Sequence, residues 1–170
     1  MVRKLRTAAP LLILAIVLTL TACAGSAGNQ TGAQTAKEGT YAFRLGEALL
    51  VPGERFDASR LPKPDDVIEI PDDGESDTQY SFGDIEVTTH KIDGEERIVS
   101  IYFMKNTAAT AEGVTVGDTL DKVIAAYGQP TLTLGTEYQY DKNGVTLVFI
   151  VRDTVQSVEY RFDKWAQSEN

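Results

Sequence analysis

The sequence predicts an α+β fold in which a helix followed by an antiparallel meander of strands occurs twice, with the helices on one face of the sheet. Three observations support this prediction. An apolar stripe with helical spacing lies between residues 117 and 130, strand-like runs follow it, and a weaker copy of the same order lies between residues 40 and 104. Helices and strands repeat with periods of 3.6 and 2 residues, so each element can be justified separately.

The helix of the second copy is the clearest element. Asp118 is a good N-cap, because its carboxylate can accept a hydrogen bond from the first turn. Gly128 and Pro130 mark the end, since glycine adopts the left-handed conformation and proline cannot continue a helix. The apolar residues share one face at the spacing i, i+3, i+4 and i+7: Leu120, Val123, Ile124 and Tyr127. The spacing predicts a short helix of about ten residues.

Three strands are expected after this helix. The first covers 137–140 and ends at Asn143-Gly144, a pair that is typical of tight hairpin turns. The second covers 145–152 and is rich in β-branched residues. A turn at Asp153-Thr154 leads to the third, over 155–162. This half of the chain therefore predicts a helix followed by a meander.

An earlier stretch repeats this order in a weaker form. A short helix is expected over 51–61, and strands are expected over 79–82, 84–92 and 97–103, with a turn at Asp93-Gly94. The stretch Tyr80-Ser-Phe82 matches Tyr138-Gln-Tyr140, and Ile98-Val-Ser-Ile101 matches Val155-Gln-Ser-Val158. The matches predict a duplicated unit. The expected organisation is a first repeat at 40–104, a joint at 105–112, a second repeat at 113–165 and a polar tail at 166–170.

The N-terminal residues have the composition of an export signal. Arg3, Lys4 and Arg6 precede an apolar run of 13 residues from Ala8 to Leu20. A run of this length is shorter than the ~20 residues of a membrane-spanning helix, and it fits a secretory signal peptide. Residues 1–22 are therefore expected to be removed. The next segment, 23–39, contains no large apolar residue and is expected to be a flexible tether.

The end of this signal resembles the lipobox of bacterial lipoproteins. Leu20, Thr21 and Ala22 stand directly before Cys23, which is the only cysteine of the chain. The resemblance implies that the signal is cut before Cys23 and that the Cys23 thiol carries a lipid. Two or more acyl chains give lasting membrane attachment, so the mature chain would be held at the outer side of a membrane, or at an outer membrane if the host has one. The alternative is that Cys23 is an ordinary thiol at the end of a simple signal peptide.

The charge of the mature chain restricts its partners. Without residues 1–22, which hold 3 of the 16 basic residues and no acidic one, 13 basic and 25 acidic residues remain, a net charge of −12. Such a charge disfavours contact with nucleic acid and with an anionic bilayer surface. The sequence therefore predicts no nucleic-acid partner. It favours a domain that stands away from the membrane on its tether.

The second repeat resembles the unit of the BamE/SmpA-type lipoproteins. The resemblance rests on Gly117-Asp118-Thr119, on Val123 and on Tyr127-Gly128-Gln129-Pro130, followed by a hairpin with tyrosines. The tandem order is similar to the β-lactamase-inhibitor-protein-like fold. This resemblance implies a non-enzymatic protein that binds another protein, as an envelope-assembly factor or as an inhibitor. Over residues 50–103 the resemblance is poor, because prolines interrupt the first helix.

Residues that could carry chemistry are sparse. His90 is the only histidine, so metal or triad chemistry would need partners from distant parts of the sequence, without a second histidine, and a structural role is expected for His90. The acidic run at 65–77 contains possible calcium ligands without the EF-hand spacing, and it is expected to be a solvated loop; weak calcium binding is the alternative. No nucleotide, serine-hydrolase or zinc-protease motif occurs. We expect no catalytic residue, no cofactor and no metal.

Aromatic residues on the strands are the best candidates for partner contacts. Tyrosine is frequent in protein interfaces because it offers a large apolar ring with a polar end. Tyr102, Tyr138 and Tyr140 are the candidates, with burial in the core as the alternative for each. The sequence thus predicts a lipid-anchored, non-enzymatic module that binds a protein or a cell-wall ligand. The alternatives are an envelope-assembly factor of the BamE type and a small hydrolase.

Overall fold

The computed structural model describes residues 39–72 and 75–163. The predicted signal peptide with Leu20, Thr21 and Ala22, the lipidation site Cys23, the tether up to residue 38 and the polar tail lie outside the described residues. The chain divides into two units, residues 1–33 and 34–170, and every described element belongs to the second. Within the described ranges no helix has the length and apolar character needed to cross a membrane.

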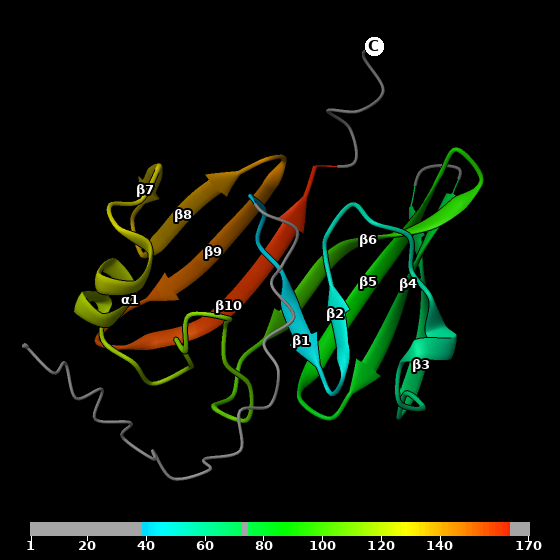
Figure 1. The fold of residues 1–170 in the computed structure, drawn as a ribbon, viewed down its shortest axis with the longest axis horizontal. Coiled ribbons are helices and arrows are strands. Elements are labelled where there is room, and N and C mark those ends of the chain that lie inside the picture. Colours follow the sequence, from blue (N-terminus) through cyan, green and yellow to red (C-terminus); the bar gives the residue numbers. More distant parts are fainter. Residues whose placement is uncertain (1–38, 73–74, 164–170) are drawn as a thin grey trace, which may run out of the picture. The chain divides into compact units, whose positions relative to one another are not determined.

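Eight strands form one antiparallel sheet (Figure 1). In chain order they are β3 (Asp66–Asp72), β4 (Glu75–Phe82), β5 (Ile85–Ile92), β6 (Glu95–Phe103), β7 (Leu132–Leu134), β8 (Glu137–Lys142), β9 (Val145–Val151) and β10 (Val155–Phe162). Their order in the sheet is β3-β4-β5-β6-β10-β9-β8-β7. Each half is a meander of four strands, and the halves meet where β6 pairs with β10. The strand order is therefore symmetrical about the β6–β10 contact.

The predicted α+β fold with helices on one face is wrong, because the structure is mainly β. The described residues contain one α-helix, α1 (Leu120–Tyr127), and one short 3-10 helix, η1 (Ala58–Arg60). A second, two-stranded sheet is formed by β1 (Phe43–Leu45) and β2 (Ala48–Leu50). The repeating part of the chain is the meander alone, and only one of the two meanders is accompanied by an α-helix.

Of the expected helix at 51–61 only the 3-10 helix η1 is present, because the backbone of residues 53–56 bonds to the sheet. The Gly53 N–H donates to the Ile98 carbonyl oxygen at 2.7 Å, and the Phe56 N–H donates to the Glu96 carbonyl oxygen at 2.8 Å. In return, the Ile98 N–H donates to the carbonyl oxygen of Glu54 at 3.0 Å. These bonds extend the sheet along the part of β6 that β10 does not reach. A backbone committed to strand partners cannot also make the bonds of a helix.

The acidic run at 65–77 is a hairpin rather than a solvated loop. Asp66–Asp72 forms β3, which pairs antiparallel with β4 from Val67 opposite Tyr80 to Asp72 opposite Glu75. The β-branched residues Val67, Ile68 and Ile70 favour an extended backbone, and this preference prevails over the acidic composition. Residues 73 and 74 lie outside the described residues.

The two tight hairpin turns are correctly predicted from the sequence. Asp93 and Gly94 connect β5 to β6 with φ of 55° and 77°, and Asn143 and Gly144 connect β8 to β9 with φ of 50° and 77°. Two successive residues with positive φ form the type I′ turn, whose twist matches that of the strands it joins. Asn, Asp and Gly tolerate this conformation better than other residues.

The two meanders share a β-bulge at the same position. Thr88 and Thr89 of β5 face Ser100 and Ile98 of β6, so Val99 is an extra residue. In the other half the register shifts between Val155 and Ser157 of β10 opposite β9. These bulges coincide with the matching stretches Ile98-Val-Ser-Ile and Val155-Gln-Ser-Val. The internal similarity of the sequence therefore corresponds to strands with a bulge, which bends and twists the strand that carries it.

Both additional elements cover the same face of the sheet. The ring of Phe43 on β1 lies 5.5 Å from Phe103 and 5.8 Å from Tyr160. The ring of Tyr127 on α1 lies 5.5 Å from Tyr140 and 5.4 Å from Phe149. Figure 1 shows β1 and β2 in front of the large sheet. Burial of such side chains stabilises the fold by roughly 1.5–3 kcal/mol each, so this face forms the core.

The α-helix begins one residue later than predicted. Its N-cap is Thr119, whose hydroxyl accepts a hydrogen bond from the Lys122 N–H at 3.3 Å. Asp118 instead accepts from the Thr115 N–H at 2.7 Å and from Lys122 Nζ at 2.7 Å, which fixes the loop that enters the helix. These hydrogen bonds lower the pKa of the Asp118 carboxyl, with the bond from Lys122 as the largest cause. The helix ends at Gly128 with a φ of 79°, as the sequence predicts.

Candidate functional site: the polar face of the sheet

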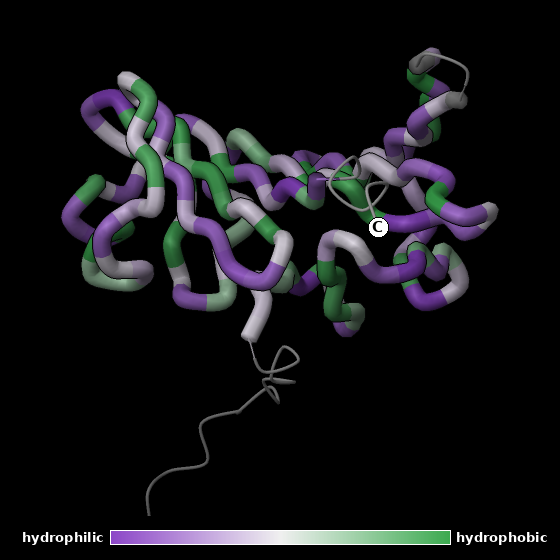
Figure 2. The backbone as a smooth tube through the Cα atoms, turned by 90° about the horizontal axis from the view of Figure 1, so that it is seen from above, coloured by the Kyte–Doolittle hydropathy of each residue, from purple (hydrophilic) through white to green (hydrophobic). Residues whose placement is uncertain are grey.

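The face of the sheet opposite α1 and β1 carries mainly polar side chains. Successive side chains of a strand point to opposite faces, so each strand that sends an apolar residue into the core sends its neighbours the other way. Figure 2 shows this alternation of hydrophobic and hydrophilic residues along the strands. We call this surface the polar face and define it by Glu86, Thr88, Ser100, Tyr102, Glu137, Gln139, Asp141, Thr146, Val148, Glu159 and Arg161.

Tyr102 lies at the centre of a row of residues that crosses all eight strands. The row follows from the pairing register of neighbouring strands, in which Tyr102 of β6 faces Glu86 of β5 and Glu159 of β10. Residues directly opposite each other on neighbouring strands have side chains in contact range on the same face. From edge to edge the row consists of Asp66, Ser81, Glu86, Tyr102, Glu159, Val148, Gln139 and Leu132. An aromatic ring therefore stands between two carboxylates beside the centre of the sheet.

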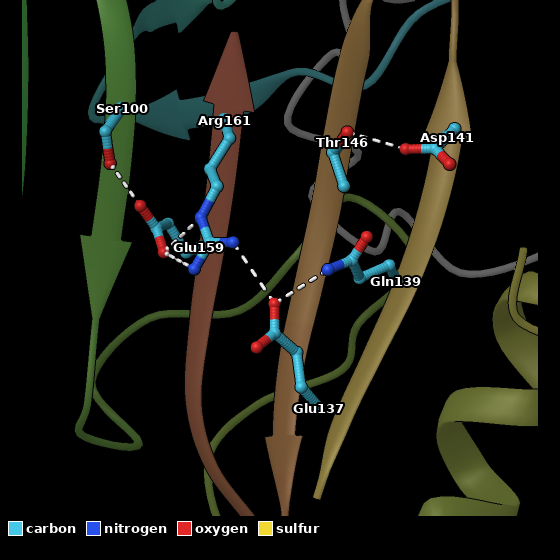
Figure 3. Close-up of polar contacts among 7 residues, drawn as sticks. All are labelled: Ser100, Glu137, Gln139, Asp141, Thr146, Glu159 and Arg161. Carbon is cyan, nitrogen blue, oxygen red and sulfur yellow. Dashed lines mark hydrogen bonds and ion pairs between the residues drawn. The ribbon is translucent and has the colours of Figure 1, made fainter. Parts of the chain in front are cut away.

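Hydrogen bonds connect the polar side chains across the strands (Figure 3). The Ser100 hydroxyl donates to Glu159 Oε1 at 3.0 Å, and Arg161 Nε donates to Glu159 Oε2 at 2.8 Å. Glu137 Oε1 accepts from Arg161 at 3.1 Å and from Gln139 Nε2 at 2.9 Å. The network therefore joins β6, β10 and β8, and holds each of these side chains in one orientation.

The ion pair between Arg161 and Glu137 crosses the strand between them. Arg161 faces Thr146 and Glu137 faces Ile150, so by register the line from β10 to β8 crosses β9 at Val148. Figure 3 shows the contact between the Arg161 and Glu137 side chains. Val148 is only 1% exposed although it points to the polar face. We infer that the stem of Arg161 covers it, since arginine commonly packs its methylene groups on apolar surface while its charged group stays in water.

The polar face is acidic in balance. Among its defining residues, four carboxylates (Glu86, Glu137, Asp141 and Glu159) stand against one cation, Arg161. The hydrogen bond to Glu159, together with the charges of Glu159 and Glu137, raises the pKa of the Arg161 guanidinium above its ordinary value. The arrangement fits a partner surface that brings cationic or hydrogen-bond-donating groups.

The structure separates the three tyrosines predicted to bind a partner. Tyr102 lies on the polar face and is partly buried. Tyr138 and Tyr140 of β8 face Phe149 and Leu147 of the core, so they lie on the opposite face. Tyr140 is 2% exposed, and its hydroxyl donates to the Gly128 carbonyl oxygen at 3.4 Å. Tyr138 packs against the core cluster. Tyr102 is thus the one of the three on the candidate surface.

Sequence reasoning missed most of the polar face. Ser100, Glu137, Glu159 and Arg161 were not singled out as candidates. A signal for them exists in the alternation of Glu159-x-Arg161 and Glu137-x-Gln139, which places both members of each pair on one side of a strand. Their connection to each other depends on which strands are neighbours. The chain order gives no information about the β6–β10 contact.

A second polar region is a cavity on the core side of the first meander. It has a volume of about 290 Å³ and is lined by residues of β3, β4, β5 and β6. Inside it, Glu96 Oε1 accepts hydrogen bonds from the Tyr80 hydroxyl at 2.9 Å and from Thr89 Oγ1 at 2.6 Å. Burial, followed by the bond to Glu96, raises the pKa of Tyr80 to about 12. We call this region the Glu96 cavity; its lining residues are Val67, Glu69, Ser76, Thr78, Tyr80, Thr89, His90, Lys91 and Glu96.

His90 and the acidic run show no metal site where they are described. His90 is 6% exposed, and its Nδ1 lies 2.6 Å from Asp77 Oδ1. Among the side chains of the described ranges, no group of three His, Cys, Asp or Glu residues lies close enough together to hold a metal ion. Asp73 and Gly74, at the centre of the calcium alternative, lie outside those ranges.

Comparison with known proteins finds no matching family model, no similar curated protein and no similar solved structure.

Proposed function

We propose that this chain is a membrane-anchored lipoprotein of the cell exterior that binds a protein or cell-wall partner with the polar face of its sheet and catalyses no reaction. The mature chain starts at Cys23, whose thiol carries the lipid. Residues 24–39 connect this lipid to the folded domain. The membrane is therefore one partner of the protein, and the occupant of the polar face is the other.

The central row with Tyr102 is the observation that supports this function best. Around Tyr102 the polar face carries hydroxyl, carboxylate, amide and guanidinium groups of β6, β10 and β8 that are joined by hydrogen bonds. No described helix packs over them. Such a preorganised surface binds with little loss of side-chain freedom. The tyrosine offers the rigid aromatic contact that typically dominates an interface.

The charge supports the proposed place of the domain. Negative charge repels the domain from an anionic bilayer, so the tether and the lipid hold it near the membrane without laying it on the surface. The same charge attracts a partner with basic groups, and long-range attraction speeds the encounter of the two. The lipid anchor thus keeps the domain near the membrane, and the polar face determines which partner binds.

Two measurements on the full-length protein in its own cells test the proposal. Mass spectrometry of the mature N-terminus should find a diacylated Cys23 and no residues 1–22, and Cys23→Ser should release the protein from the membrane fraction. Crosslinking should join the protein to a defined envelope component, and Tyr102→Ala should lower the yield about tenfold or more, as loss of a central aromatic contact does. The matched variant is Tyr41→Ala, because the Tyr41 ring lies 5.9 Å from that of Tyr127 on α1, on the other side of the sheet. This variant should keep the yield.

Two results would contradict the proposal. If the Cys23 thiol is unmodified and residues 1–22 are still attached, the proposed lipid anchor is wrong. If the crosslinking yield is unchanged in a folded and membrane-bound Tyr102→Ala variant, the polar face does not bind the partner.

A further inference from the structure

The edge strand β3 exposes apolar side chains on both faces of the sheet. It is the first strand in the order of the large sheet, and among residues 39–72 and 75–163 no strand pairs with its outer edge. Val67, Ile68 and Ile70 are 50%, 47% and 40% exposed. An open edge with exposed β-branched residues is the structure to which a further strand can be added.

The charges along this edge are all negative. Asp66 and Glu69 are exposed on β3 itself, and Asp65 directly precedes it. Within 61–72 the nearest cation in the sequence is Lys63, which precedes the strand by three residues. A strand that pairs with β3 would therefore be stabilised by basic side chains and destabilised by acidic ones.

The Glu96 cavity lies beside this edge. Val67 and Glu69 form the part of its wall that β3 contributes, and Glu96 lies deeper, on β6. Because side chains alternate, Ile68 and Ile70 point to the other face of the sheet. A strand added to β3 would thus place every second side chain next to Glu69 and the cavity, and the others next to Ile68 and Ile70.

We propose that β3 is the docking edge for an extended peptide segment in which basic and apolar residues alternate. The segment pairs with β3 through its backbone. Its lysine or arginine side chains lie over Val67 toward Glu69 and the cavity, and its apolar side chains cover Ile68 and Ile70. Ile68 and Ile70 lie on the same side of the sheet as the polar face but outside its defining residues, and the proposal does not depend on the occupant of that face.

A second copy of the chain fits this edge poorly. Antiparallel pairing of two β3 strands would bring Asp66 and Glu69 of one copy toward the carboxylates of the other, and like charges on neighbouring strands are destabilising. The net charge of −9 of the whole chain adds to this repulsion. A basic partner segment gains from the same charges.

The test measures the binding of synthetic peptides to the full-length lipidated protein in detergent micelles by fluorescence anisotropy. The first peptide alternates valine and lysine. The second alternates valine and glutamate, and the third is the valine-lysine peptide with every second backbone nitrogen methylated, which prevents strand pairing. The proposal expects saturable binding of the first peptide only, because it alone combines the required charge with free backbone N–H groups.

Variants of the protein locate the binding. Glu69→Lys should weaken binding of the valine-lysine peptide about tenfold, as expected for one lost charge-assisted contact that becomes repulsive. Ile70→Thr keeps the β-branched shape, removes apolar surface and should weaken binding to a smaller extent. Glu47→Lys makes the same charge change in the exposed turn between β1 and β2, and it should leave the affinity unchanged within twofold.

Several results would overturn the proposal. They are absence of saturable binding, equal binding of the methylated peptide, and equal effects of Glu69→Lys and Glu47→Lys. Sedimentation that shows a dimer of the wild-type protein, which Ile70→Thr weakens, would assign the edge to a second copy of the chain instead.

Discussion

Arg161 of β10 reaches across β9 to Glu137 of β8, with 3.1 Å between its guanidinium nitrogen and Glu137 Oε1. The strand between them contributes Val148, which points to the polar face and is 1% exposed. Between Glu86 and Gln139, the central row contains one further apolar group, the ring of Tyr102. We infer that the pair combines an ionic contact with a cover of Val148 by the methylene groups of Arg161. It ties together three strands of the second meander.

Replacement of Arg161 tests this double role. Arg161→Ala removes both the ion pair and the cover, and should lower the free energy of unfolding by about 0.5–1 kcal/mol, because the partners are partly exposed and solvent screens their attraction. Arg161→Met keeps much of the apolar side chain over Val148 and should lower the free energy of unfolding by less. Urea denaturation measures the free energy of unfolding of both variants. Arg152→Ala, in the exposed turn after β9, is the control and should be neutral. Equal losses for Arg161→Ala and Arg161→Met would show that the methylene stem contributes nothing.

Gly53 is required where the segment after β2 joins β6. Its φ is 86°, and a Cβ at this position would lie 2.6 Å from Cε2 of Phe162. Gly53→Ala should therefore lower the free energy of unfolding by about 2–4 kcal/mol, from backbone strain together with displacement of the ring. Gly83 also has a positive φ, 61°, but in the described part of the chain no heavy atom lies within 4 Å of the added Cβ.

Gly83→Ala is thus the matched control, and it should cost only about 1 kcal/mol of backbone strain. Thermal denaturation of the two variants compares them directly. If Gly53→Ala were no worse than Gly83→Ala, the close approach of Gly53 to Phe162 would be disproved.

Tyr160 carries a hydroxyl that the core does not satisfy. The residue is 1% exposed, and its Oη has no hydrogen-bond partner among residues 39–72 and 75–163. Burial raises the pKa of this phenol. An unsatisfied buried hydroxyl destabilises a fold by about 1–3 kcal/mol, so Tyr160→Phe should leave stability unchanged or raise it by about 1 kcal/mol.

Tyr80→Phe is the opposite case. The Tyr80 hydroxyl donates to Glu96 at 2.9 Å, so its removal should lower the free energy of unfolding by about 1 kcal/mol. Calorimetry measures the stability of Tyr160→Phe and Tyr80→Phe and thus distinguishes the two cases. A clear loss of stability in Tyr160→Phe would mean that its hydroxyl is bonded in solution.

Alkaline pH should destabilise the protein. Burial, followed by the hydrogen bond to Glu96, raises the pKa of Tyr80 from 10.0 to about 12. A phenol whose pKa is higher in the folded than in the unfolded state contributes stability that is complete below the unfolded value and is lost as the pH rises toward the folded one. Tyr41, Tyr127, Tyr140 and Tyr160 also have raised pKa values, chiefly through burial.

Stability should therefore fall as the pH rises from about 10 to about 12. Urea midpoints on both sides of this window measure the loss, and Tyr80→Phe should reduce it. A loss complete below pH 10, or one that Tyr80→Phe does not change, would contradict the prediction.

The sequence predicts the strands well where local signals are sufficient. Asp93-Gly94 and Asn143-Gly144 specify their turns. The β-branched residues of 145–152 predict β9, and the sequence of 155–162 predicts β10. The helix over 120–127 follows from its apolar spacing and from Gly128. Each of these features depends on neighbours in the chain.

The remaining elements depend on distant partners. The segment 53–56 contains residues compatible with a helix, but the free edge of β6 provides hydrogen-bond partners that the local sequence does not reveal. β3 was missed because acidic residues and prolines surround its few β-branched residues, and β4 stabilises it by pairing. The short β7 likewise depends on its pairing with β8.

The candidate site shows the same limit. Tyr102 was identified by residue type, whereas its position between Glu86 and Glu159 requires the pairing of β6 with β5 and β10. Tyr140 had an equally good sequence signal. It lies in the core because α1 covers that face of β8.

The most direct test of the central claim, that the polar face binds a partner, is photocrosslinking in the host cell. A photoreactive amino acid replaces Tyr102 on the polar face in one full-length variant, and exposed Ala125 on α1 in the other. The account predicts a discrete adduct with one envelope component from position 102 and none from position 125. An adduct from position 125 alone, or no adduct from position 102 in a folded and membrane-anchored protein, would contradict it.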